Sequence, residues 1–489
     1  MKTYIAVDIG ASSGRLIKSQ LVNGKIKMEE IHRFKNGFVF SEGNDRWDVE
    51  YLSKEILIGL EKLKKQGISE CFVGIDTWAV DYCLLDGNGN LIEQPISYRD
   101  RRTELALEEF NKKMRLDTLY EKTGIQLQPF NTAFQLFVEN KRKLKNAEAL
   151  LLIPDYLGYV YTGKKVMERT NASTMQLLNP TTKLFDEDIL KVLNVSESLF
   201  PPIVEAGSNL GDLIKEKFSD YDLPDAHFIN IASHDTASAV VGTPGNDENW
   251  AYISSGTWSL LGVETKVPNV SREAFLANYT NEGGACNTIR FLKNIMGMWL
   301  IQEVARMQDY RYSYEQLAEL ASETPAFQQF VDINHERFLN PENMIVELQH
   351  YCGETNQTVP ETPGEIARCV YDNLALCYAV ELEKLEELRG TKGKITKLHI
   401  VGGGSNNRLL NQLTADVAQI TVEAGPSEAT AIGNLVMQMI VAGDISDVKE
   451  ARKIIYESSK IHSYQPNTVD PTVLENYKKA IQTRKEENS

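Results

Sequence analysis

A short pattern near the start of each half of the sequence limits the choice of fold more than any other feature. Apolar residues at 4–9 and 15–22 flank a turn of small residues at 10–14. Residues 250–263 repeat this order of apolar strand, glycine and hydroxyl turn, and apolar strand. Small residues permit tight turns with exposed N–H groups. The repetition predicts a duplicated fold in which each half contributes one such hairpin.

The periodicity of apolar residues in the first half predicts α/β architecture. Apolar residues recur at helical spacing over 49–65, and the run at 71–76 is typical of a buried strand. A further strand is predicted over 226–232, and residues 103–223 are expected to be mainly helical. Strands and helices in this order predict an α/β fold.

The length of the chain, 489 residues, predicts two domains, because one hydrophobic core rarely grows so large. The turn cluster at 242–249 places the expected boundary, giving domains 1–245 and 246–489. In the second domain, three glycines at 402–404 follow a predicted strand and precede a predicted helix over 408–417, a position suited to a nucleotide. The tail from residue 467 is expected to be a surface helix.

The charge balance argues against two classes of partner. Lys and Arg number 52 against 68 Asp and Glu, a formal charge of -16. Such a surface repels nucleic-acid phosphates and anionic lipids, so we expect neither nucleic acid nor membrane as a partner. The sequence shows neither a secretory signal nor an apolar run long enough to span a bilayer, so we expect a cytoplasmic protein.

The cysteines suggest no metal site. The six cysteines include no pair with two residues between them, and the seven histidines show no zinc-ligand spacing. Six reduced, mostly buried thiols are therefore expected in the cytosol. Cys352 and Cys369 could close a loop, although spacing alone does not establish a disulfide.

The chain offers each group that phosphoryl transfer requires: a cradle for phosphates, a cation and a base near the attacking hydroxyl. Residues 11–15 supply N–H groups, two hydroxyls and a guanidinium, and residues 254–257 supply a second turn. Asp8 ends a strand just before the first turn and could hold Mg²⁺ through water. An ordinary hairpin turn with a capping aspartate is the alternative.

Asp235 is the candidate base. It follows a predicted strand in a run of small residues, at the expected start of a helix. A carboxylate in that position could accept the proton of a substrate hydroxyl. The alternative is helix capping, which the local sequence slightly favours, with His234 in a structural role.

The stretch Gly74-Ile-Asp-Thr-Trp-Ala-Val-Asp81 combines two acids, a hydroxyl and an indole after a buried strand. An aromatic ring can cover the C–H face of a sugar while polar groups bind its hydroxyls. Alternatively, this stretch is a strand edge whose acids face water. Residues 158–165 resemble a Walker A loop, but Lys165 replaces the required hydroxyl residue, so a helix ending at Gly163 is predicted. The glycines at 402–404 likewise lack dinucleotide-binding spacing.

Taken together, these motifs resemble those of the FGGY family of carbohydrate kinases over about residues 4 to 465. Val7-Asp-Ile-Gly-Ala-Ser-Ser-Gly-Arg15 and Ala232-Ser-His-Asp-Thr-Ala-Ser-Ala239 carry the resemblance together with further stretches. These are residues 74–81, 125–131, 253–259, 281–284, 293–297 and 400–404.

The resemblance implies a duplicated actin/hexokinase-like (ribonuclease H-like) fold of two domains with an interdomain cleft for ATP, and phosphorylation of L-rhamnulose at its C1 hydroxyl. It makes Asp235 the proton acceptor, and Mg²⁺ at Asp8 fits the family's requirement. The implied sugar contacts are Ala79, His234, Asp235, Thr236 and Asn294. The implied ATP contacts are Ala11, Ser12, Ser13, Gly14, Arg15, Thr257, Gln302 and Gly403. We expect the sugar and ATP as partners, and a monomer or weak homo-oligomer.

Two positions qualify the resemblance. Ala79 stands where the family pattern usually has glycine. Its methyl group lies beside the expected sugar site, so we expect it to affect how tightly the sugar binds or which sugar is preferred. Cys352 and Cys369 match cysteines that can be disulfide-linked in relatives. The alternatives are a kinase for another ketose, such as fuculose or xylulose, and an ATPase of the same fold that does not act on sugar.

Overall fold

The computed structural model describes residues 1–246, 249–390 and 394–487, which form two compact units. Unit 1 holds residues 1–246, 264–292 and 429–458, and unit 2 holds the described residues within 247–263, 293–428 and 459–489. Domains 1–245 and 246–489 remain a prediction. The compact units differ from that division because two later segments return to unit 1. Residues 247–248 of the predicted turn cluster lie outside the described residues.

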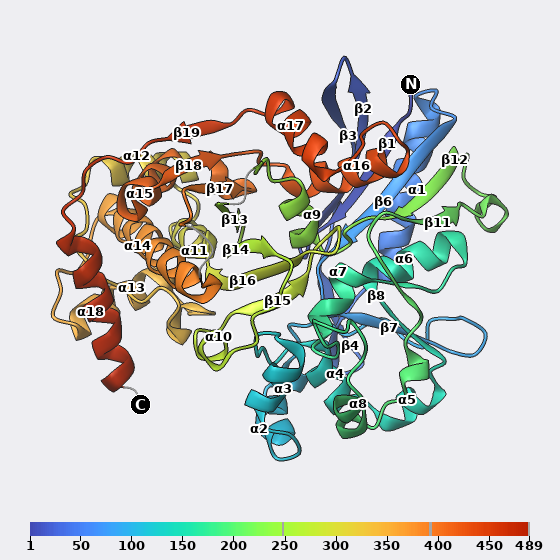
Figure 1. The fold of residues 1–489 in the computed structure, drawn as a ribbon, viewed down its shortest axis with the longest axis horizontal. Helices are drawn as coiled ribbons and strands as arrows, with labels where there is room; N and C mark the ends of the chain where they lie inside the picture. The colour runs from blue at the N-terminus through green and yellow to red at the C-terminus, as the bar shows by residue number, and fades with distance from the viewer. Residues whose placement is uncertain (247–248, 391–393, 488–489) are drawn as a thin grey trace. The chain divides into compact units, whose positions relative to one another are not determined.

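Unit 1 is built on a six-stranded mixed sheet with the order β11-β12-β6-β1-β2-β3 (Figure 1). The strands β12, β6 and β1 are parallel, whereas β2, β3 and β11 are antiparallel to their neighbours. The predicted first hairpin and the strands predicted at 71–76 and 226–232 are confirmed. The bounds are β1 Tyr4–Ile9, β2 Ser13–Val22, β3 Lys25–Lys35, β6 Glu70–Thr77, β11 Ser208–Asp212 and β12 Asp225–Asn230.

Side chains of β1 alternate between two hydrophobic cores. Ile5 and Val7 belong to the core that includes residues of the helices α1 (Val49–Lys65) and α6 (Ile153–Thr162). Tyr4 and Ala6 belong to the core that includes α9 (Asp235–Val241) and α16 (Ala429–Val441). Because strand side chains alternate with a period of two, Asp8 lies on the face that α9 and α16 cover.

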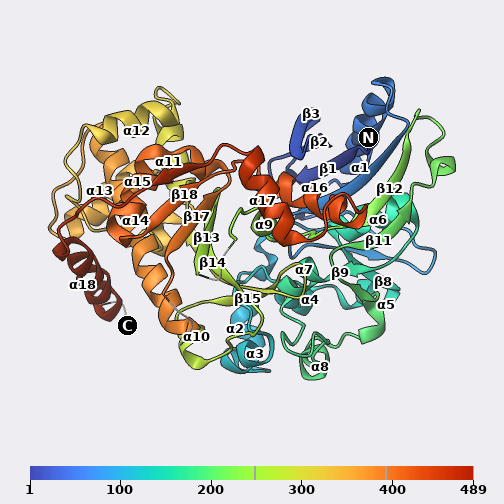
Figure 2. The same cartoon turned by 45° about the horizontal axis from the view of Figure 1, so that its top comes forward.

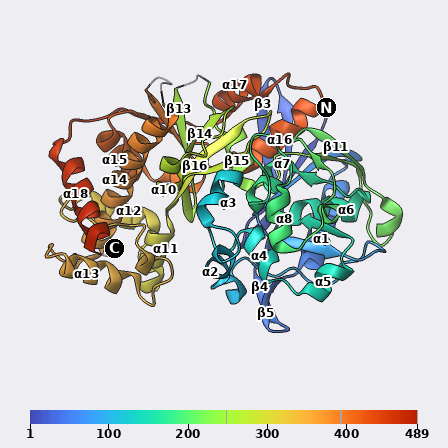
Figure 3. The ribbon, with the colours of Figure 1, turned by 60° about the horizontal axis from the view of Figure 1, so that its bottom comes forward.

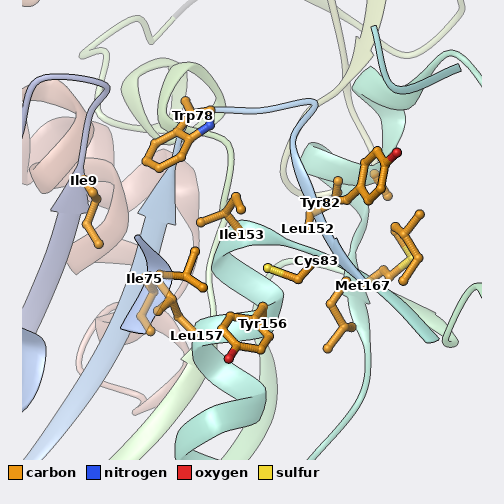
Figure 4. Packing of buried hydrophobic residues seen from close by; sticks show 14 of the residues in the cluster. Ile9, Ile75, Trp78, Tyr82, Cys83, Leu152, Ile153, Tyr156, Leu157 and Met167 are labelled. Atoms are coloured by element: carbon orange, nitrogen blue, oxygen red, sulfur yellow. The ribbon is translucent and has the colours of Figure 1, made fainter. Parts of the chain in front are cut away.

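Helices on both faces of the sheet follow signals in the sequence. The helix α1 has the predicted bounds, and Asp48 caps it by accepting from the N–H of Tyr51 at 2.8 Å. The helix α6 ends at Gly163, whose φ of 72° is left-handed, so the Walker-like stretch is a helix end as predicted. Figure 4 shows Ile75 beside Leu157 of α6. In Figure 2, α9 and α16 lie side by side.

The prediction that residues 103–223 are mainly helical is wrong in part. The helices in this segment are short, and four strands lie among them. The strand β8 pairs with β7 (Tyr82–Leu85), and β11 joins the edge of the main sheet. Pairing with β7, which lies far earlier in the sequence, decided the strand β8, and a local apolar pattern does not reveal such pairing. The bounds are α2 Ala106–Asn111, α3 Leu116–Thr123, α4 Thr132–Val138, α5 Lys141–Asn146, α7 Arg169–Ala172, α8 Glu187–Leu193, β8 Ala149–Leu152, β9 Met167–Glu168 and β10 Ile203–Val204.

Unit 2 repeats the strand arrangement of unit 1. Its strands follow one another as β14-β13-β17-β18-β19, with β13, β17 and β18 parallel and an antiparallel strand on each side. The predicted second hairpin is β13–β14, so the duplicated α/β fold is confirmed. Figure 3 shows α14, α15 and α18 in this unit. The bounds are β13 Trp250–Ser255, β14 Trp258–Thr265, β17 Lys397–Val401, β18 Thr421–Ala424, β19 His462–Tyr464, α11 Trp299–Met307, α12 Tyr314–Ser322, α13 Met344–Glu354, α14 Pro363–Arg389, α15 Arg408–Ala418 and α18 Thr472–Glu487.

Two further expectations concern the whole chain. All six cysteines are free, so Cys352 and Cys369 form no disulfide in this structure. Five of the six thiols are buried, and Cys286 is exposed. Across the described residues, no helix combines the length and apolar character needed to cross a membrane.

Candidate functional site

Three aspartates of unit 1 meet where the parallel strands of its sheet end. Asp8 on β1 lies opposite Asp76 on β6 in the strand register. The N–H of Thr77 donates to the carbonyl of Ser233 at 3.0 Å, two residues before Asp235. Burial raises the pKa of Asp76 well above its usual value, and the charges of Asp8 and Asp235 raise it further. The candidate site thus lies at the carboxyl ends of the strands, the edge where open α/β sheets bind ligands.

The turn at residues 10–14 has the features of an anion cradle. The N–H groups of Ala11 and Ser12 meet no acceptor in the part of the chain that the structure describes. A side chain at Gly14 would overlap the ring of Phe34, so only glycine allows β2 to pass at this distance. Free N–H groups on a turn that is close to the strand ends can receive phosphate oxygens.

Asp8 and Arg15 face each other across the hairpin and form an ion pair. The Nε and Nη2 atoms of Arg15 donate to Oδ2 of Asp8 at 3.1 and 2.9 Å. Both side chains are mostly buried. Among the described residues no turn N–H donates to Asp8, so the alternative that Asp8 caps the turn is wrong. Asp8, the predicted Mg²⁺ contact, and Arg15, a predicted ATP contact, are therefore paired with each other in this structure.

Asp235 is the first residue of α9, and one of its two carboxylate oxygens is unoccupied. Oδ1 lies 2.6 Å from the N–H of Thr236, 3.2 Å from its hydroxyl, and 3.3 Å from Nε2 of His234. Within the described chain Oδ2 has no hydrogen-bond partner, and 36% of the Asp235 side chain is exposed, so a ligand can reach this oxygen. Partial burial of the carboxylate, followed by the charge of Asp8, raises the pKa of Asp235 to about 6. The carboxylate therefore has a free oxygen and a pKa suited to a general base near neutral pH.

Asp235 is not the N-cap residue of α9, although its Oδ1 accepts from the N–H of Thr236 in the first turn of that helix. The N-cap position of α9 belongs to His234, and no side chain makes a capping hydrogen bond there. The preceding Ser233 is engaged elsewhere, because its N–H and hydroxyl donate to Oε2 of Glu168 at 3.0 and 2.9 Å. Glu168 is fully buried and also accepts from Thr170. Sequence reasoning missed Glu168, which anchors the turn that presents Asp235.

Asp81 organises the stretch after β6. Its Oδ2 accepts from the indole N–H groups of Trp47 and Trp78 at 2.6 and 2.9 Å, and Oδ1 accepts from Gln135 at 2.9 Å. Asp76 and Asp81 are 0% and 1% exposed, so the alternative that these acids face water is wrong. Burial raises the pKa of Asp81 to about 6. The bend that carries the predicted sugar contact Ala79 is therefore fixed by a buried carboxylate.

Unit 2 gathers three of the predicted ATP contacts around one turn. The carbonyl of Thr257 accepts from the N–H of Trp299 at 3.2 Å, so the turn meets the start of α11, which carries Gln302. A side chain at Gly402 would come within 2.8 Å of the carbonyl oxygen of Ser255, so the glycine cluster packs against the same turn. Gly403 lies in this cluster, and Asn294 lies on β16 (Ile289–Met296).

The acids of unit 1 fit a magnesium ion of ordinary coordination. Mg²⁺ usually takes one or two protein carboxylates and keeps several waters. Beside Asp8, the buried Oδ1 of Asp76 has no hydrogen-bond partner in the described chain. No set of three His, Cys, Asp or Glu residues in the described ranges is placed to hold a metal ion. The side chains therefore suit an ion held mainly by water and substrate, not a closed protein site.

Models of a known family match both parts of the chain. The N-terminal domain of the FGGY family of carbohydrate kinases matches residues 3–242, and the C-terminal domain of that family matches residues 251–442. A rhamnulokinase of Enterococcus faecalis (strain ATCC 700802 / V583) is 65% identical over 477 residues, covering 97% of both chains. A rhamnulokinase of Bacillus subtilis (strain 168) is 51% identical over 479 residues, covering 98% of both chains.

Solved structures agree on the fold. A ligand-bound xylulose kinase from Lactobacillus acidophilus superposes with a TM-score of 0.79 at 16% identity, over 99% of this chain and 97% of that one. A Plasmodium falciparum glycerol kinase with ADP gives a TM-score of 0.79 at 16% identity, over 100% of this chain and 98% of that one. With matches to both family domains and close relatives along its whole length, the chain belongs to the FGGY family of carbohydrate kinases.

Proposed function

We propose that this protein transfers the γ-phosphate of ATP to the C1 hydroxyl of L-rhamnulose, giving L-rhamnulose 1-phosphate and ADP. Two relatives with the name rhamnulokinase, 65% and 51% identical, support the choice of sugar. The observation that carries the chemistry is the free Oδ2 of Asp235, partly exposed at the start of α9. The glycine-rich turns of both units support the choice of ATP as the phosphate donor.

In the proposed reaction, Oδ2 of Asp235 accepts the proton of the C1 hydroxyl. The hydroxyl oxygen forms a bond to the γ-phosphorus while the bond from that phosphorus to the β–γ bridging oxygen breaks, and ADP leaves. Asp235 must be ionised to accept the proton, and its pKa of about 6 leaves it ionised at neutral pH. His234, Thr236, Ala79 and Asn294 would hold the sugar in the orientation that this step needs.

The proposed ATP contacts lie in both units. In unit 1 the turn of residues 11–14, through the free N–H groups of Ala11 and Ser12, and the guanidinium of Arg15 would receive phosphate oxygens. In unit 2 the turn at Thr257, with Gln302 and Gly403, would complete the contacts with ATP. Asp8 would hold Mg²⁺ through water, and the ion, when bound, offsets negative charge on the phosphates. On this proposal, residues 1–245 provide the catalytic group and the sugar contacts other than Asn294, and residues 246–489 provide Asn294 and the adenosine site.

Further features of the proposal follow from the family and the charge of the chain. A cytoplasmic enzyme with a net charge of -16 would meet its sugar and ATP in solution, without nucleic acid or membrane. A monomer or weak homo-oligomer suffices, because every proposed site residue comes from one chain.

A panel of ketoses tests the function. A coupled assay measures ADP release. We expect this release to depend on sugar, with the highest kcat/KM for L-rhamnulose. The Asp235→Asn variant serves as the blank for contaminating kinases. Preference for fuculose or xylulose would overturn the choice of substrate. ADP release that is equal with and without every sugar would replace the kinase with an ATPase.

A further inference from the structure

A buried ion pair on the hairpin β15–β16 lies behind the candidate base. Glu282 on β15 (Thr280–Gly283) and Arg290 on β16 are opposite each other in the strand register. Nη2 of Arg290 lies 3.0 Å from Oε2 of Glu282, and its Nε donates to the carbonyl of Gly283 at 3.0 Å. Arg290 is 0% exposed and Glu282 is 7% exposed. Two contacts in a fixed fork hold the guanidinium in one orientation.

The guanidinium of Arg290 fixes which nitrogen of His234 carries the proton. Its Nη2 lies 3.0 Å from Nδ1 of His234. A guanidinium can donate hydrogen bonds but cannot accept them, so Nδ1 accepts from Arg290; Oε2 of Glu282 lies farther from Nδ1, at 3.5 Å. Burial and the charge of Arg290 lower the pKa of His234 well below its usual value, so the ring is neutral. A neutral ring that accepts at Nδ1 carries its proton on Nε2.

Nε2 of His234 lies close to the carboxylate of the candidate base. Nε2 lies 3.3 Å from Oδ1 of Asp235, so in this tautomer a partly positive N–H lies beside that carboxylate. The N–H and hydroxyl of Thr236 donate to the same oxygen at 2.6 and 3.2 Å. These two donors, with the N–H of His234 nearby, hold Oδ1 and leave Oδ2 for the substrate. With the proton on Nδ1 instead, Nε2 would present a lone pair to the carboxylate and repel it.

We propose that Arg290, held by Glu282, is a positioning residue: it fixes His234 in the Nε2–H tautomer and so orients Asp235 for proton transfer. The catalytic part of this inference rests on the proposed function, whereas the tautomer does not. Arg290 has none of the proposed contacts with sugar or ATP, and it acts through His234. A purely structural ion pair would affect stability, but would leave the tautomer and the turnover of folded enzyme unchanged.

The tautomer can be measured directly in the full chain without substrate. Nitrogen-15 and proton correlation spectra of the seven histidines distinguish the two tautomers from the charged ring, and the missing signal in His234→Gln assigns His234. We expect the neutral Nε2–H form in the wild type at neutral pH. A neutral Nδ1–H ring, or a charged ring, would overturn the proposal whatever the variants do.

The variants test the link from tautomer to turnover. Because removal of Arg290 alone would leave Glu282 buried without its partner, the test combines Arg290→Met with Glu282→Gln. We expect His234 in this double variant to lose its single tautomer, and kcat to fall by about 10- to 100-fold, as expected for a misplaced catalytic group. KM for ATP should stay within about twofold, since the ATP contacts are untouched. Arg290→Lys, which keeps a donor, should recover part of kcat.

A folded double variant with an unchanged tautomer and unchanged kcat would overturn the proposal. If the double variant does not fold, Arg290→Lys and the wild-type spectrum still decide the matter. Failure of the proposed function looks different: no ketose would be phosphorylated, yet His234 would still show the Nε2–H form.

Discussion

Replacement of Asp235 by Asn is expected to lower kcat by about 10³-fold, within the range for loss of a general base. Asparagine has the same shape and can keep an acceptor oxygen toward Thr236 and His234. It cannot accept the proton of the C1 hydroxyl at Oδ2. The fold and the binding of sugar should therefore persist while turnover is lost.

Three measurements separate this expectation from a folding defect. Coupled ADP release gives kcat, calorimetric titration gives sugar affinity, and a thermal melt reports the fold. Asp220→Asn is a matched control. Asp220 is exposed, and its replacement makes the same change of charge outside the candidate site. Turnover of Asp235→Asn within a few-fold of the wild type would remove Asp235 from the role of base.

Gly433→Ala is expected to lower the free energy of unfolding. A side chain at Gly433 on α16 would overlap the carbonyl oxygen of Ser238 on α9 and come within 3.0 Å of the backbone nitrogen of Gly242. At Gly242 a side chain would in turn overlap the carbonyl oxygen of Ala429. The backbones of α9 and α16 are therefore in contact, and an added side chain would force the two helices apart. Such overpacking costs about 1–3 kcal/mol or more.

The same change should also lower activity, because α9 begins at Asp235. We expect a lower melting temperature in calorimetry and a reduced kcat in the fraction that stays folded. Gly353→Ala provides the matched control: this helical glycine of α13 has nothing within 4 Å of an added side chain. In a helix that change is neutral or stabilising by up to about 1 kcal/mol. Equal melting temperatures for the two variants would contradict the tight crossing of α9 and α16.

Local signals in the sequence were sufficient for much of the fold. The hairpins at 4–22 and 250–263, the helix α1 and the end of α6 at Gly163 are set by turn residues, helical spacing and a left-handed glycine, all of which lie within a few residues. The strand β8 within 103–223 was missed because pairing with β7, far earlier in the chain, and not local preference, formed it.

The site divides in the same way. Asp8, the turn at 10–14 and Asp235 could be predicted, because each combines a strand end with small residues. Glu168, Glu282 and Arg290 could not, because isolated charged residues on strands usually face solvent. Only the folded chain shows that these three side chains are buried around the turn that presents Asp235.

The pH dependence of kcat/KM for L-rhamnulose tests most directly whether ionised Asp235 is the base. The pKa of about 6 lies above the usual value for aspartate, so lowering the pH through 6 protonates Oδ2 and removes the acceptor. We predict that kcat/KM falls by about tenfold per pH unit below that point, and that the residual activity of Asp235→Asn shows no such fall. A wild-type profile that stays flat well below that pKa would contradict the account.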